Sequence, residues 1–104
     1  MALELNQTEQ DGNCIVAAKG EIDLYSSPQL REAILKACKA KTRKVGIDLR
    51  DVGYMDSSGV ATLVEGLQAA GGADSFALVA PSQPVLKVLQ LSRLDSVFPI
   101  VEQL

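Results

Sequence analysis

The chain has 104 residues, the size of one domain, and its 47% apolar and 22% charged residues are typical of a globular protein. A formal net charge of −3 and an aromatic content of 4% disfavour a nucleic-acid partner and an anionic membrane surface. Because histidine is absent, Ser–His and Cys–His catalysis and His-ligated metals are excluded. No run of 18 apolar residues is present, so we expect no membrane insertion.

Two features predict a cytoplasmic protein. The first ten residues lack the charged and apolar regions of a secretory signal. Cys14 and Cys38 lie far apart, each within an apolar pattern, which indicates buried and reduced thiols. The sequence has no repeats, linkers or low-complexity segments, so we expect a single domain over residues 1–104.

A β-hairpin is predicted at the start of the chain. Leu3-Glu4-Leu5 alternates as a half-buried strand does, and Asp11-Gly12 is a strong turn signal. The apolar run 14–18 then forms a second strand, which ends at Gly20.

The first helix is expected to begin with Ser27 as its N-cap and Pro28 as its first residue. Apolar residues at helical spacing continue it to about Lys41: Leu30, Ala33, Ile34, Ala37 and Cys38. Basic residues cluster at and beyond its end: Lys36, Lys39, Lys41, Arg43 and Lys44. We interpret this cluster as a solvated helix end that matches the helix dipole.

The remaining elements alternate in type. A strand over 45–49 precedes a helix with the apolar stripe Val60, Leu63, Val64 and Leu67, which ends at Gly71-Gly72. A buried strand over 76–80, a helix that opens at Ser82 and Pro84, and an extended piece over 97–100 follow. This order predicts an α/β domain with a central mixed sheet, in which an N-terminal hairpin precedes parallel strands joined by helical crossovers.

A polar turn, Asp56-Ser57-Ser58-Gly59, lies between the third strand and the second helix. Its two hydroxyls are expected in the first helical turn, where backbone N–H groups are unpaired. Loops at the carboxyl ends of parallel strands meet at one edge of a sheet. The loop 20–27 should therefore bring Glu21 and Asp23 close to this turn.

Three kinds of chemistry fit this turn in outline. A serine hydrolase would need an activating base and a G-x-S-x-G pattern, and both are missing. A phosphate-binding loop would need a lysine after Gly59. A magnesium site from Asp23, Asp48 and Asp56 would also need a bound phosphate. A simple helix cap needs only one hydroxyl, so a cap and a modified serine both remain open.

The chain resembles the STAS domain of bacterial anti-sigma-factor antagonists over essentially its whole length. The resemblance rests on Gly20-Glu21-Ile22-Asp23, on Ile47-Asp48-Leu49 and on the stretch 54–60, which contains the Asp56-Ser57-Ser58-Gly59 turn. The segments 85–89 and 94–98 fit the same pattern in order and spacing. The resemblance implies a STAS-like fold.

The resemblance also implies a regulatory switch that is not an enzyme and needs no cofactor or metal of its own. It implies that Ser58 accepts phosphate from an anti-sigma factor that is also a serine protein kinase, with Ser57 as a secondary acceptor. The unphosphorylated form would bind that partner, and a metal-dependent serine phosphatase would reset the switch. The expected partner-binding residues are Asp23, Tyr25, Asp56, Ser57, Ser58 and Gly59.

Phosphate on Ser58 is expected to lie among Asp23, Asp48 and Asp56 and to weaken binding by repulsion. An alternative function within the same family is that of a non-phosphorylated STAS subunit in a lipid or anion transport complex. Only the fold and the basic cluster support that alternative, whereas the acceptor serine favours the switch.

Overall fold

The computed structural model describes residues 3–40 and 42–104, where five strands form one sheet in the order β1-β2-β3-β4-β5. β1 is antiparallel to β2, and the remaining neighbours are parallel. The predicted α/β domain with a mixed sheet is therefore confirmed. The strands are β1 (Glu4–Gln10), β2 (Asn13–Ile22), β3 (Val45–Met55), β4 (Phe76–Val79) and β5 (Ile100–Val101), and the helices are α1 (Ser27–Lys39), α2 (Ser57–Ala69) and α3 (Gln83–Leu91).

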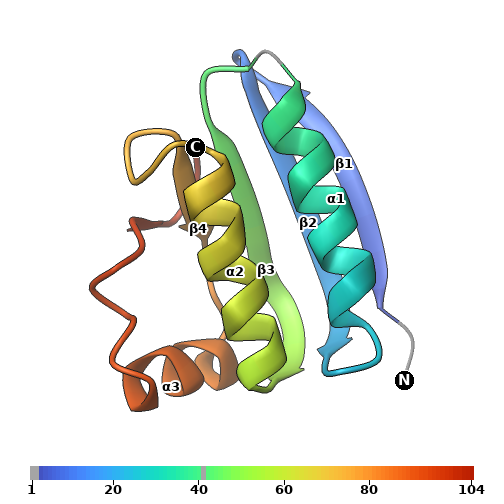
Figure 1. Ribbon diagram of the computed structural model, residues 1–104, viewed down its shortest axis with the longest axis vertical. Coiled ribbons are helices and arrows are strands. Elements are labelled where there is room, and N and C mark those ends of the chain that lie inside the picture. Colours follow the sequence, from blue (N-terminus) through green and yellow to red (C-terminus); the bar gives the residue numbers. More distant parts are fainter. Residues whose placement is uncertain (1–2, 41) are drawn as a thin grey trace.

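The three helices occupy different places on the sheet. α1 and α2 lie side by side over one face, and α3 lies at the lower end in Figure 1. The residue before α3, Ser82, donates its amide to the carbonyl of Leu49 at 3.3 Å and its hydroxyl to that of Val52 at 2.6 Å. These two hydrogen bonds hold the start of α3 against the second half of β3, beyond the point where β4 ends.

The core is aliphatic, as the composition predicts. It lies between the sheet and the two long helices, and Phe76 and Phe98 pack with ring centroids 6.3 Å apart. Cys14 is buried and Cys38 is partly buried, and both are free thiols whose pKa is raised mainly by burial. The largest fully buried aliphatic side chains include Ile22, Leu30, Ile34, Ile47, Leu49, Leu63, Leu78 and Leu89.

The predicted hairpin turn is confirmed at Asp11-Gly12. Both residues have positive φ angles, 53° and 85°. This conformation matches the twist of the flanking strands, and it suits Asp-Gly. β1 and β2 pair without interruption from Glu4 opposite Lys19 to Gln10 opposite Asn13.

β3 is longer than predicted, and this changes the site. The sequence predicts a strand over 45–49 followed by a loop, but β3 continues to Met55. The pairing of β2 with β3 shifts register between Ala17 and Lys19 and again between Gly20 and Glu21. These irregularities break the two-residue alternation, so the buried residues after Leu49 recur every third position, at Val52 and Met55.

Other element boundaries also differ from prediction. The N-cap of α1 is Ser26, and Ser27 is a buried helical residue. α1 ends at Lys39, and Lys41 lies outside the described residues. β5 starts at Ile100 because Val97 closes a turn on Leu94. Within residues 3–40 and 42–104, each helix is too short or too polar to cross a membrane.

Candidate functional site

The polar turn occupies the junction of β3 and α2. Asp56 is the N-cap of α2, and both serines lie in the first helical turn as predicted. Oδ1 of Asp56 accepts the amide of Ser58 at 2.9 Å and also the Ser58 hydroxyl. The Asp56 carbonyl accepts the amides of Gly59 and Val60 at 3.1 and 3.2 Å. A single aspartate therefore fixes both the backbone of this turn and the hydroxyl of Ser58.

The two adjacent serines have different surroundings. Ser57 is exposed, and its hydroxyl makes no hydrogen bond with the residues that the structure describes. Ser58 is half-buried, and its carbonyl accepts the Thr62 hydroxyl at 2.9 Å. The Ser58 hydroxyl has a defined direction, whereas that of Ser57 is free to rotate.

Gly59 lets α2 approach the ends of two strands closely. It is buried, and a Cβ at this position would lie 2.6 Å from Cγ of Met55 and 2.8 Å from Cγ2 of Ile22. Real Cβ atoms do not make contacts this short, so glycine is required here for space. Gly59 thereby fixes the depth at which the serine turn sits.

Asp23 organises the second loop of the site. Its Oδ1 accepts the amides of Tyr25 and Ser26 at 2.9 and 3.0 Å, and the Ser26 hydroxyl lies 3.1 Å from the same oxygen. The pKa of Asp23 is lowered, chiefly by the hydrogen bond from the Ser26 amide. The Ser26 hydroxyl also contacts the Glu21 carbonyl at 2.9 Å and accepts the Asp23 amide at 2.9 Å. The loop is therefore ordered by its own polar groups.

The two loops meet at one edge of the sheet, as predicted. The amide of Asp56 donates to the carbonyl of Ile22 at 3.1 Å, and Ile22 pairs with Met55 in the parallel register. This edge forms the lower end of the molecule in Figure 1. Asp23 and Ser58 thus belong to one surface, although 35 positions separate them in the sequence.

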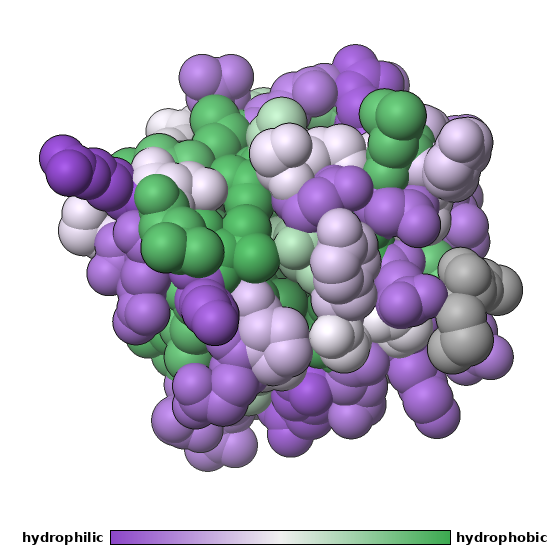
Figure 2. Space-filling view, turned by 90° about the horizontal axis from the view of Figure 1, so that it is seen from below, coloured by the Kyte–Doolittle hydropathy of each residue, from purple (hydrophilic) through white to green (hydrophobic). Residues whose placement is uncertain are grey.

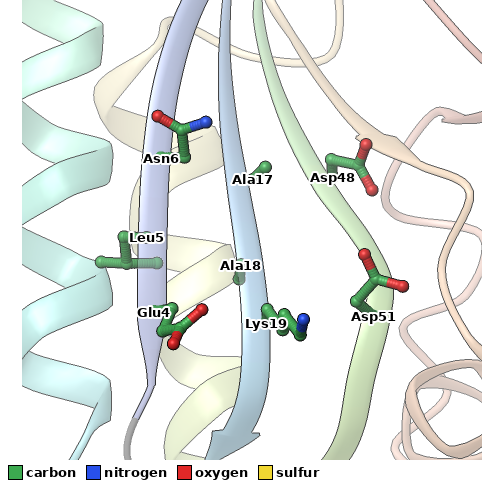
Figure 3. A pocket seen from close by; sticks show the side chains of 8 residues that line it. All are labelled: Glu4, Leu5, Asn6, Ala17, Ala18, Lys19, Asp48 and Asp51. Atoms are coloured by element: carbon green, nitrogen blue, oxygen red, sulfur yellow. The ribbon is translucent and has the colours of Figure 1, made fainter.

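Asp48 does not belong to that surface, so its predicted place beside the phosphate site is wrong. It lies within β3, opposite Ala17, and forms an ion pair with Arg50 at 3.1 Å. Figure 3 shows Asp48 and Asp51 beside a shallow pocket of about 290 Å³ on the sheet. Eight residues of extended chain place Asp48 roughly 25 Å from Asp56. Within the described residues, no three His, Cys, Asp or Glu side chains cluster as metal ligands, so the magnesium trio does not form.

Exposed apolar side chains accompany the polar ones at this edge. Tyr25, which the sequence singled out, is 90% exposed, and its neighbour Leu24 is 68% exposed. Tyr54, at the end of β3, is 47% exposed. Figure 2 views this end of the molecule and shows hydrophobic areas among polar ones. Where such side chains form a contiguous patch with a polar rim, they mark a site of protein–protein interaction.

The sequence interpretation missed several residues of this edge: Leu24, Ser26 and Tyr54. Leu24 had a detectable signal, since it is an apolar residue in a polar loop and outside every helical or strand periodicity. Ser26 had none, because Ser26 and Ser27 are equally good caps by residue type. Tyr54 was hidden by the assumption that β3 had already ended.

Comparison with known proteins places this arrangement in a family. An anti-sigma-B factor antagonist of Staphylococcus aureus is 36% identical over 69 residues, which cover 66% of this chain and 64% of the relative. A solved anti-sigma factor antagonist from Mycobacterium paratuberculosis has a TM-score of 0.89 at 27% identity, covering 99% of this chain and 88% of its own. The solved structure of the anti-sigma factor antagonist SpoIIAA in its unphosphorylated form has a TM-score of 0.70 at 26% identity. The match covers 95% of this chain and 87% of SpoIIAA. The STAS domain profile matches residues 4–104, and the chain therefore belongs to the STAS domain family.

Proposed function

We propose that this chain is an anti-sigma-factor antagonist and a phosphorylation-controlled binding module. In its unphosphorylated form it binds an anti-sigma factor that is also a serine kinase, and phosphorylation of Ser58 releases it. One observation carries the proposal: the Ser58 hydroxyl lies in the first turn of α2, fixed by Asp56, at an edge that also exposes Leu24 and Tyr25. The similarity to proteins named as anti-sigma factor antagonists supports it.

Electrostatics explains how phosphate would act as a switch. A phosphoserine carries about 1.5 to 2 negative charges and three acceptor oxygens. The Asp56 carboxylate, which accepts a hydrogen bond from the Ser58 hydroxyl before modification, would then face phosphate oxygens. Asp23 adds a second carboxylate to the same edge. A penalty of about 3 kcal/mol would weaken binding by roughly a hundredfold, enough to exchange partners.

The proposal makes the chain a substrate and a ligand, not an enzyme. The kinase partner supplies nucleotide and metal, and a metal-dependent serine phosphatase restores the hydroxyl. Without histidine, the chain has no imidazole that could activate Ser57 or Ser58. Free thiols at Cys14 and Cys38 support a reducing compartment, the cytoplasm.

Phosphorylation and binding assays test this function. The chain is incubated with its partner kinase and ATP, and the modified residue is located by mass spectrometry; we expect Ser58. Ser58→Ala should bind the partner whether or not ATP is present, and Ser58→Asp should bind roughly a hundredfold more weakly. Ser57→Ala is the matched control and should keep the ATP-dependent release. Equal binding by Ser58→Ala and Ser58→Asp would show that this switch is wrong.

A further inference from the structure

We infer that Asp56 is a positioning residue that selects Ser58 over Ser57 as the phosphate acceptor. The inference rests on the proposed function and adds to it a physical reason why the kinase would modify Ser58 and not Ser57. The two hydroxyls are adjacent on the same helical turn, and Ser57 is the more exposed. Exposure alone would therefore favour Ser57, so another feature must favour Ser58.

The distinguishing feature is a hydrogen bond. Oδ1 of Asp56 accepts both the Ser58 hydroxyl and the Ser58 amide, which holds the hydroxyl in one orientation. Among the described residues, the Ser57 hydroxyl has no hydrogen-bond partner. A kinase that docks on this edge meets Ser58 Oγ in one position and Ser57 Oγ in several.

Asp56 is itself fixed before any partner arrives. Its amide donates to the carbonyl of Ile22 at 3.1 Å, and its carbonyl accepts the amides of Gly59 and Val60. Gly59 packs against Met55 and Ile22 without room for a side chain. The orientation of the acceptor is consequently a property of this fold and does not depend on the kinase.

The transfer step defines what this orientation does. Ser58 Oγ forms a bond to the γ-phosphorus of a nucleoside triphosphate held by the kinase, as the bond from that phosphorus to the bridging oxygen breaks and the nucleoside diphosphate leaves. The hydroxyl proton passes from its hydrogen bond with Asp56 to a base of the kinase. Because catalysis of this step depends on positioning, a fixed Oγ favours Ser58.

Two substitutions separate the hydrogen bond from the rest of the turn. Asp56→Asn keeps an acceptor oxygen, and Asp56→Ala removes it. We expect Asp56→Asn to retain modification at Ser58 alone, with a rate within a few-fold of the wild type. Asp56→Ala should lower kcat for Ser58 about tenfold, the effect of one lost hydrogen bond to a charged group, with a smaller change in KM. Phosphate should then also appear on Ser57.

Ser82→Ala is the matched control for lost stability. Ser82 is the N-cap of α3, its hydroxyl donates to Val52, and it lies outside the serine turn. This variant should keep both the rate and the choice of Ser58. The phosphosites are mapped by mass spectrometry, and kcat and KM are obtained from steady-state transfer of labelled phosphate from ATP at varied concentrations of each variant.

The outcomes distinguish this inference from the proposed function. Absence of phosphate at both serines of the wild type overturns the proposed function. Modification of Ser58 in the wild type, with the same rate and the same site in Asp56→Ala, overturns the role of Asp56 and leaves the switch intact. A loss in Asp56→Ala that Asp56→Asn does not restore also overturns selection by this hydrogen bond.

Discussion

At the scale of single residues, the site is built around two aspartates whose side chains accept hydrogen bonds from backbone amides. Asp23 accepts hydrogen bonds from the loop before α1, and Asp56 accepts them from the first turn of α2. Both are short acceptor side chains, which suit turns and helix caps. Their structural task also places two negative charges at the edge that carries Ser58, the proposed acceptor. The same residues thus order the surface and supply the charge on which repulsion of a phosphate would depend.

The lowered pKa of Asp23 predicts an acid-sensitive loop. Hydrogen bonds, chiefly from the Ser26 amide, favour the charged carboxylate in the folded state. They thereby lower the pKa of Asp23 below its ordinary value of 3.8. This contribution to the free energy of unfolding is therefore complete above pH 3.8 and is lost as the pH falls through the lower, folded-state value. In Asp23→Asn, which has no titrating carboxyl group at this position, the free energy of unfolding should not show this decrease in acid.

Urea denaturation at a series of pH values from about 7 to 3 measures the effect, since the unfolding free energy follows the protons bound. The stability advantage of the wild type over Asp23→Asn should stay constant near neutral pH and shrink in acid. Ser26→Ala, which removes one of the donors to Asp23, should fall between them. Parallel curves for all three proteins would contradict the assignment of the shift to these hydrogen bonds.

At the scale of elements, α1 and α2 are joined by close packing more than by charge. A Cβ on Gly66 of α2 would lie 2.7 Å from Cγ2 of Ile34 and 3.0 Å from Cε1 of Phe76. The two helices also share an exposed ion pair, Arg31 with Glu65. Exposed ion pairs contribute little, whereas overpacking a core contact is costly.

Gly66→Ala should therefore lower the free energy of unfolding by about 1–3 kcal/mol, because the added methyl group collides with Ile34 and Phe76. The sign is informative, since alanine is otherwise the better helix former. Arg31→Ala should change the same quantity by less than about 1 kcal/mol. Chemical denaturation of both variants compares the two contributions. Gly53→Ala is the control for adding a methyl group, since a Cβ there meets nothing within 4 Å.

Periodicity predicted the elements of this chain better than their ends. The helical stripe from Leu30 to Cys38 and the apolar run at Phe76 sufficed to place α1 and β4. The second half of β3 was not predictable in this way, because its register shifts replace alternation with a three-residue spacing. Because the strand was expected to end at Leu49, Asp48 was wrongly predicted to lie beside the serine turn. The serine turn was predicted correctly because Asp56 is an acceptor at an N-cap, a local signal that needs no tertiary information.

At the scale of the whole molecule, the exposed side chains at the lower edge carry the last prediction. The hydrogen bonds of Asp23 fix the loop that bears Leu24, yet this side chain stays 68% exposed and contributes little to the core. An apolar side chain presented by an ordered loop is a good interface anchor, since little entropy is lost when it binds. Leu24 should therefore matter for binding and not for folding.

Leu24→Ala should weaken binding of the proposed kinase partner about tenfold or more, the effect expected when a central interface residue is removed. Its free energy of unfolding should stay within about 0.5 kcal/mol of the wild type, as for other exposed positions. Ile100→Ala is the matched control, because Ile100 is a 39% exposed aliphatic residue on β5, away from the serine turn. Titration calorimetry gives the affinities, and denaturation gives the stabilities. Wild-type affinity in Leu24→Ala, or an equal loss in Ile100→Ala, would place the partner on a different surface.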